Sequence, residues 1–178
     1  NNMTLELENH QTLRQEDAVL PLRVQDLQKR YKGGSWANRG ISFDMKAGEI
    51  LGILGPNGAG KTTLVRQITT ELLPTSGSVH IMGYDAVTEP NEVKALLGVV
   101  PQEGRLFEHL TVRQHLRIFG KLRGLTPKHA AARAEELVVG LRLEDYGNTS
   151  IAKLSGGMRH RILIGLAALA HPPLMVLD

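Results

Sequence analysis

The sequence predicts an α/β fold, because three kinds of segment follow one another along the chain. Apolar runs typical of strands alternate with helical patterns towards both ends, over about residues 22–100 and 155–178. A glycine-rich loop at residues 55–60 joins a continuous apolar run to a helical pattern. A mostly helical stretch, about residues 101–154, separates the two parts. This order indicates strands and helices arranged around a helical insertion.

The first strands are expected on both sides of a turn. Residues 22–24 and 41–45 alternate as half-buried strands do, and residues 32–35 between them carry a turn signal. The uninterrupted apolar run at residues 50–54 favours a strand that is buried on both faces. A helix with Leu64, Ile68 and Leu72 on its apolar face follows the glycine-rich loop, and Pro74 ends it. Further short elements are predicted as a strand at 79–82, a helix at 90–97 and a strand at 98–100.

Three later helices are predicted from their first residues. Thr111 followed by Gln114 is a capping box. Thr126 precedes Pro127, which suits the first turn of a helix, and Ser155 is placed to cap a helix that runs to about residue 170. An apolar strand is expected at residues 174–178.

Composition excludes several classes of protein. The 178 residues suffice for one domain with a real core, and 42% hydrophobic with 22% charged residues is typical of globular chains. The absence of cysteine excludes disulfides, thiolate metal sites and a cysteine nucleophile. A net charge of +3 admits nucleic acid or an anionic membrane as partner, but the lack of a long Lys/Arg block gives that reading little support. The apolar stretch 162–177 is too short for a membrane span, and we expect no signal peptide.

The glycine-rich segment fits the phosphate-binding loop pattern. Its glycines let successive backbone N–H groups point at phosphates, and the helix that follows adds the positive end of its dipole. Lys61 is expected to reach the β- and γ-phosphates, Thr62 to offer its hydroxyl to Mg²⁺, and Thr63 to bind the α-phosphate. The pattern indicates a nucleoside triphosphate without distinguishing a kinase, a GTPase or an ATPase. Its residues are Gly55, Pro56, Asn57, Gly58, Ala59, Gly60, Lys61 and Thr62.

A second glycine motif carries a family resemblance. Leu154, Ser155, Gly156, Gly157 and Met158 expose backbone N–H groups at a helix N-terminus, which makes another anion site. With this motif the chain, from about Leu22 onward, resembles the nucleotide-binding domain of ATP-binding cassette (ABC) transporters, whose signature is LSGGQ. The LSGGM form followed by basic residues resembles the ATP-binding subunit of ABC-2 type exporters.

The resemblance implies a particular organisation of the chain. A P-loop NTPase fold with an ABC-type core sheet is implied, with an N-terminal antiparallel β part and a helical subdomain inserted at about residues 102–154. We expect residues 1–20 to form a polar N-terminal tail and residues 21–178 to form a partial nucleotide-binding domain. Two such domains of a homodimer would sandwich ATP, with the signature of one facing the γ-phosphate held by the other.

The resemblance also assigns roles to single residues. Gln102 resembles the Q-loop glutamine that touches Mg²⁺ or the attacking water, which with Lys61 makes the catalytic set. Asp178, at the end of an apolar strand, resembles the Walker B aspartate that holds Mg²⁺. Tyr31 is similar to the aromatic residue that stacks on adenine, and Trp36 competes with it for this role.

The chain departs from the family pattern at its end. The family places a general-base Glu directly after the Walker B Asp, whereas this chain stops at Asp178, so we expect a fold that is incomplete at the C-terminus. None of the seven histidines lies where it could replace the missing groups, and Leu166 occupies a region where the family often has Arg. We therefore expect the 178-residue chain to bind ATP weakly at best and not to hydrolyse it.

The function implied is that of an energy-coupling ATPase subunit. ATP-dependent dimerisation would drive membrane-spanning permease subunits, with the protein peripheral on the cytoplasmic side of the membrane and no nucleic acid as partner. One alternative is a soluble ABC ATPase that acts on ribosomes or DNA. Another is a nucleotide sensor that does not hydrolyse ATP.

Overall fold

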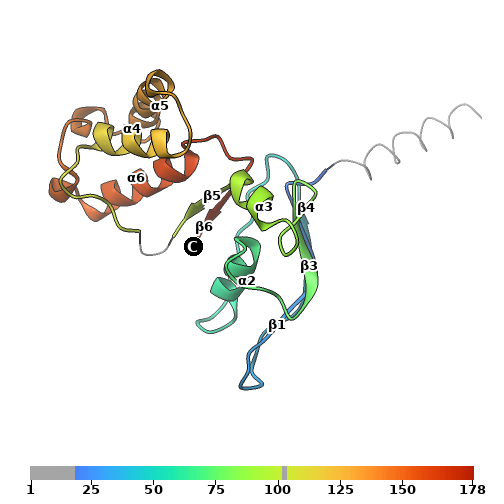
Figure 1. Ribbon diagram of the computed structural model, residues 1–178. Helices are drawn as coiled ribbons and strands as arrows, with labels where there is room; N and C mark the ends of the chain where they lie inside the picture. The colour runs from blue at the N-terminus through green and yellow to red at the C-terminus, as the bar shows by residue number, and fades with distance from the viewer. Residues whose placement is uncertain (1–18, 102–103) are drawn as a thin grey trace, which may run out of the picture.

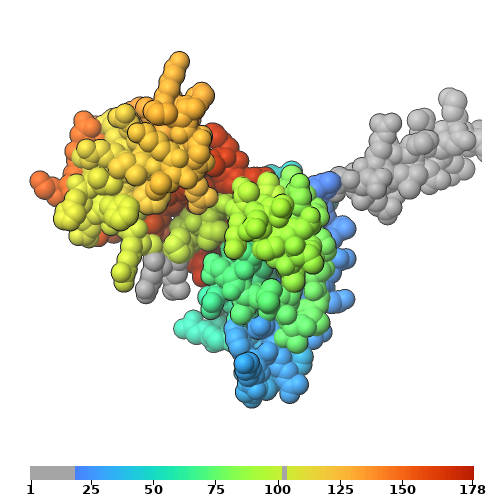
Figure 2. Space-filling view, viewed as in Figure 1, coloured from blue at the N-terminus to red at the C-terminus, as the bar shows by residue number. Residues whose placement is uncertain are grey.

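The computed structural model describes residues 19–101 and 104–178. The predicted tail therefore lies almost entirely outside the described residues, and so does Gln102. The described elements form two groups, each around its own cluster of buried apolar side chains. Figure 1 shows the strands β1, β3 and β4 with the helices α2 and α3 in one group and the helices α4, α5 and α6 in the other. Figure 2 shows the same groups as two lobes of the surface.

The N-terminal strands form an antiparallel sheet, as predicted. Leu22, Val24 and Leu27 are buried, and the change of spacing after Val24 follows a register shift in both pairings of the first strand. Gly77 permits the close approach of β3 to β1 at this register shift, because a Cβ at residue 77 would lie 2.3 Å from the carbonyl oxygen of Asp26. The sheet order is β2-β1-β3-β4. Its strands are β1 (Leu22–Arg30), β2 (Trp36–Met45), β3 (Ser76–Ile81) and β4 (Tyr84–Asp85).

A separate parallel pair forms where the later strands were predicted. Strand β5 (Leu97–Val100) pairs in parallel with β6 (Leu174–Leu177), from Leu97 opposite Leu174 to Val100 opposite Leu177. Gly98 lets the C-terminal part of the last helix approach, since a Cβ there would lie 2.5 Å from Ala167 O. Helices α2 (Lys61–Ile68) and α3 (Pro90–Leu96) contribute Leu64, Ile68 and Val93 to the same apolar cluster as the antiparallel sheet.

The predicted helix starts in the second group are confirmed. Thr111 and Gln114 form both hydrogen bonds of the capping box. The side chains of Thr126 and Ser155 each accept a bond from the backbone N–H three residues later. These caps precede α4 (Val112–Leu122), α5 (Pro127–Gly140) and α6 (Gly156–Ala168), which share one apolar cluster with Ile151 of the short turn η2 (Ile151–Lys153). The exposed turn η1 (Glu144–Tyr146) follows α5.

Two predictions about the first half are wrong. Residues 50–54 do not form a strand, and the side chains of Ile50 and Leu54 are 99% and 95% exposed. A strand buried on both faces needs neighbouring strands to pair with. Within the described residues, neither sheet includes residues 50–54. The helix predicted through Leu72 ends at Ile68, because Thr70 has a positive φ of 64° that breaks the helical path.

A histidine lies in the core of the helical group. His115 of α4 is fully buried, stacks on Phe119 with 4.7 Å between ring centroids, and has no hydrogen-bond partner for either ring nitrogen among the described residues. Burial lowers the pKa of His115 from its ordinary value near 6.5 to about 4, because the apolar surroundings disfavour the charged ring. The imidazole is therefore neutral at pH 7.

The free energy of unfolding should fall as the pH is lowered from 7 to 4.5. In that range the unfolded chain protonates His115 while the folded chain does not, so protons favour the unfolded state. The loss from this one residue should be about 2 kcal/mol. Urea unfolding at the two pH values measures it, and the variant His115→Leu, which cannot titrate, should lose about 2 kcal/mol less than the wild type. Equal losses in both proteins would contradict this account.

Candidate functional site

The glycine-rich loop owes its shape to glycine at two positions. Gly58 and Gly60 have φ angles of +80° and +92°, which residues other than glycine rarely adopt. Gly60 also lies directly against β2, where a Cβ would stand 2.3 Å from Ala37 O and 2.6 Å from the side-chain oxygen of Asn38. The loop is thus held against the sheet by a contact that excludes any larger residue.

Lys61 closes this loop from inside. Its ammonium group donates hydrogen bonds to the carbonyl oxygens of Gly55 and Pro56, each at 2.8 Å. The N–H of Ala59 also donates to Pro56 O at 3.2 Å. The lysine and the turn together bond the first residues of the loop to the first residue of α2.

The N-terminus of α2 is open to an anion. Gly60 is the N-cap residue, no side chain caps the helix, and its first turn contains no acidic residue. The hydrogen bond from Leu64 N to Gly60 O is the first i to i−4 bond of the helix, so the N–H groups before it have no partner within the helix. Open N–H groups, a helix dipole and the charge of Lys61 converge here and suit phosphate oxygens.

The structure separates the two aromatic candidates. The hydroxyl of Tyr31 lies 3.3 Å from the hydroxyl of Thr63, in the first turn of α2. Both rings have cations near them: the guanidinium groups of Arg30 and Arg39 lie 5.4 and 5.9 Å from the ring centroid of Trp36, and the Lys29 ammonium lies 5.7 Å from that of Tyr31. Tyr31 is therefore the aromatic residue with a contact to the loop helix.

The signature turn is built in the other group of elements. Ser155 Oγ accepts from Met158 N at 3.3 Å and opens α6, as predicted. Arg159 braces the turn, because its guanidinium donates to the carbonyls of Ile151 and Ala152 and pairs with Glu108 at 3.1 Å. Leu154 belongs to the helical cluster, whereas Leu64 behind the phosphate loop belongs to the sheet cluster. The two glycine motifs thus lie on different lobes.

Asp178 lies where two parallel strands end. Its N–H donates to Val100 O at 3.1 Å, so Asp178 stands beside the last residue of β5, two positions before Gln102. The carboxyl ends of neighbouring parallel strands share one edge of a sheet, so Asp178 lies at the edge where β5 also ends. The position of the Gln102 side chain lies outside the described residues.

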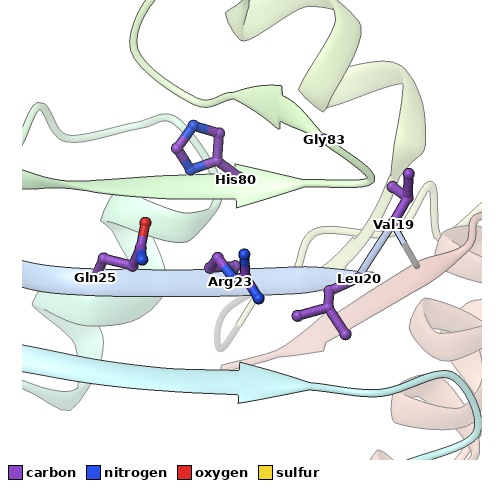
Figure 3. A pocket seen from close by; sticks show the side chains of 6 residues that line it. All are labelled: Val19, Leu20, Arg23, Gln25, His80 and Gly83. Carbon is purple, nitrogen blue, oxygen red and sulfur yellow. The ribbon is translucent and has the colours of Figure 1, made fainter. Parts of the chain in front are cut away.

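A pocket of about 340 Å³ lies elsewhere, on the exposed face of the antiparallel sheet. Two of its side chains lie beside carboxylates: Arg23 pairs with Asp44 at 3.1 Å, and the ring of His80 lies 3.6 Å from the carboxylate of Asp85. The pair with Asp44 raises the pKa of the Arg23 guanidinium. No residue of the phosphate loop lines the pocket. Figure 3 shows its lining residues, Val19, Leu20, Arg23, Gln25, His80 and Gly83.

Comparison with known proteins decides the family. The family model described as ABC transporter matches residues 38–178, which include the phosphate loop, the signature turn and Asp178. The chain belongs to the ABC transporter family. Tyr31 and Trp36 lie before the matched residues of the ABC domain.

Two relatives and one solved structure illustrate the similarity. The daunorubicin resistance ATP-binding protein DrrA3 of Streptomyces coeruleorubidus is 39% identical over 157 residues, which cover 88% of this ABC chain and 49% of that protein. The linearmycin resistance ATP-binding protein LnrL of Bacillus subtilis is 38% identical, with 88% of this chain and 50% of that protein covered. A solved ATP-binding subunit of an ABC transporter superposes with a TM-score of 0.75 at 30% identity, over 88% of this chain and 65% of that one.

The comparisons confirm the predicted fold class and show how much of each relative the chain covers. The ABC chain spans about half the length of the two curated relatives. Within residues 19–101 and 104–178, no helix is long and apolar enough to cross a membrane.

Sequence reasoning overlooked one polar feature of the site, the buried amides of Asn38 and Gln67 behind the loop. The available signal was a glutamine between apolar Leu64 and Ile68 on a short helix.

Proposed function

We propose that this chain is part of the ATP-binding and ATP-hydrolysing subunit of an ABC exporter. The observation that carries the proposal is the open N-terminus of α2, where a glycine loop closed by Lys61 presents unpaired N–H groups. Membership of the ABC family and the resistance-protein names of both relatives support an export role.

The residues of the loop divide the work of holding ATP. Lys61 turns its ammonium from the loop carbonyls to the β- and γ-phosphates, while the N–H groups of the loop and first turn bind the remaining oxygens. Thr63 contacts the α-phosphate, and the Tyr31 ring, held near Thr63, stacks on the adenine.

The exposed hydroxyl of Thr62 and the exposed carboxylate of Asp178 are oxygen donors of the kind that fit a magnesium ion. With Gln102 they would hold Mg²⁺, which supplies charge neutralisation on the β- and γ-phosphates. In the hydrolysis reaction a water oxygen bonds to the γ-phosphorus while the bond to the β–γ bridging oxygen breaks. We assign no general base among the described residues, so for this chain we propose binding without turnover.

Two copies complete one site in this proposal. The N–H groups at Ser155, Gly156 and Gly157 open α6 on the lobe that does not carry the phosphate loop. In a dimer they would meet the γ-phosphate bound by the other copy, so that ATP holds the copies together and its hydrolysis releases them. The helical subdomain at about residues 102–154 would pass this motion to membrane-spanning permease subunits, with the ABC domain peripheral on the cytoplasmic side.

The test of the proposal is ATP binding by the purified protein. A fluorescent ATP analogue should bind in the presence of Mg²⁺ and be displaced by ATP but not by inorganic phosphate. Tyr31→Ala should weaken the binding about tenfold, because a stacked base contributes about 1–3 kcal/mol. Trp36→Ala is the matched control and should leave the affinity unchanged. Absence of displaceable binding in the wild type would contradict the proposed function.

The export role has its own discriminating result. The tagged protein should co-purify with an integral membrane protein from detergent-solubilised membranes. Recovery with ribosomes, in place of a membrane protein, would favour the alternative of a soluble ABC ATPase.

A further inference from the structure

A buried pair of amides lies directly behind the phosphate loop. Asn38 of β2 and Gln67 of α2 are each only 2% exposed, in a region whose other buried side chains are mostly apolar. Asn38 Nδ2 donates to Gln67 Oε1 at 2.6 Å, and Gln67 Nε2 donates to the backbone oxygen of Gln28 on β1 at 3.3 Å. The pair therefore links strands β1 and β2 to helix α2, which begins at the loop.

The same pair touches the last residue of the loop. A Cβ on Gly60 would lie 2.6 Å from Asn38 Oδ1, so this side chain lies immediately against the Gly60 backbone. In the opposite amide orientation Asn38 Nδ2 donates to Ala37 O at 2.9 Å and to Gly60 O at 3.3 Å, and its oxygen faces a Gln67 amide turned likewise. In both orientations Asn38 lies between Gln67 and the peptide group that starts α2.

Apolar contacts alone would not specify this arrangement. Hydrophobic packing is non-directional, whereas a hydrogen-bonded amide pair sets both the spacing and the orientation of the two elements. In the first orientation the pair is satisfied only while β2, α2 and Gln28 keep their positions, and in the second only while Asn38 stays against Ala37 and Gly60, because a buried amide without a partner is unfavourable. A shift of the loop helix would break these bonds.

We propose that Asn38 and Gln67 are positioning residues that hold the phosphate loop in its nucleotide-binding geometry. The inference rests on the proposed function of the loop and assigns two residues that bind no part of the nucleotide. Their role is to keep Gly60 and the open N–H groups of α2 at a fixed place relative to the sheet.

The double variant Asn38→Val with Gln67→Leu tests the inference. Both amides are replaced by apolar groups of similar size, so no polar group is left unpaired and the chain should remain folded. We expect at least a tenfold loss of affinity for the fluorescent ATP analogue, with far-UV circular dichroism and cooperative thermal unfolding retained. The single variant Asn38→Val should weaken binding at least as much, because it leaves the Gln67 amide without its partner.

A matched control separates positioning from general loss of stability. Val79→Ala removes a buried side chain of the same apolar cluster on β3 and should lower the unfolding temperature without changing the affinity. Wild-type affinity in the folded double variant would overturn the inference while leaving the proposed function intact. A wild-type protein that does not bind ATP would overturn both. An affinity loss in Val79→Ala equal to that of the double variant would also overturn the positioning role.

Discussion

Replacing Lys61 by alanine should lower the affinity for ATP at least ~100-fold. The ammonium group closes the loop through two 2.8 Å bonds to Gly55 O and Pro56 O, and it is the cation expected on the β- and γ-phosphates. A hydrogen bond to a charged group contributes roughly 1.5–3 kcal/mol, and the substitution removes at least two such bonds to phosphate. Since 1.4 kcal/mol is tenfold in affinity, the loss should exceed two powers of ten.

The measurement is a titration of the fluorescent ATP analogue, with Lys94→Ala as the control. Lys94 is an exposed lysine of α3, outside the loop, so its removal changes the net charge equally but should leave the affinity unchanged. A Lys61→Ala protein that binds the analogue as tightly as the wild type would contradict the assignment of the loop. A similar loss in both variants would show that total charge, rather than a specific bond, determines binding.

Replacing Gly60 by alanine should destabilise the fold by about 3 kcal/mol and remove nucleotide binding. The residue has φ near +92°, and its Cβ would stand 2.3 Å from Ala37 O and 2.6 Å from Asn38 Oδ1. Real Cβ atoms do not approach backbone oxygens so closely, so either β2 or the start of α2 must move. Urea unfolding without nucleotide measures the loss of stability.

Gly58→Ala is the matched control for this substitution. Gly58 has a similar φ of +80°, but nothing lies within 4 Å of the position of its Cβ. It should lose only the roughly 1–2 kcal/mol of a left-handed alanine. The difference between the two variants isolates the contact of Gly60 with β2. Equal losses in the two variants would show that backbone conformation alone accounts for the effect.

The predictions that depend on residues close along the chain are confirmed, whereas one that depends on pairing between distant strands is wrong. Thr111, Thr126 and Ser155 were correctly placed as helix caps, because a cap bonds to a backbone N–H only three residues away. The run at residues 50–54 was wrongly predicted as a buried strand, because apolar composition shows what a segment can bury and not which strand pairs with it.

The same difference between local pattern and tertiary contact holds for the candidate site. The composition of the loop was sufficient to indicate phosphate chemistry, but it could not show that Lys61 closes the loop on its own carbonyls. The sequence favoured Tyr31 as the aromatic residue that stacks on adenine and left Trp36 as a competing candidate. Only folding brought the Tyr31 hydroxyl to that of Thr63 and the guanidinium groups of Arg30 and Arg39 to the Trp36 ring.

By itself, the sequence determined the family and the helix starts and predicted the phosphate loop and the signature turn, since these patterns lie in residues that are neighbours along the chain. The tertiary structure alone decided that Asn38 and Gln67 meet behind Gly60 and that the two glycine motifs lie on different lobes. The physical reason is that Asn38 and Gln67 are 29 residues apart, and their contact exists only once β2 and α2 have packed.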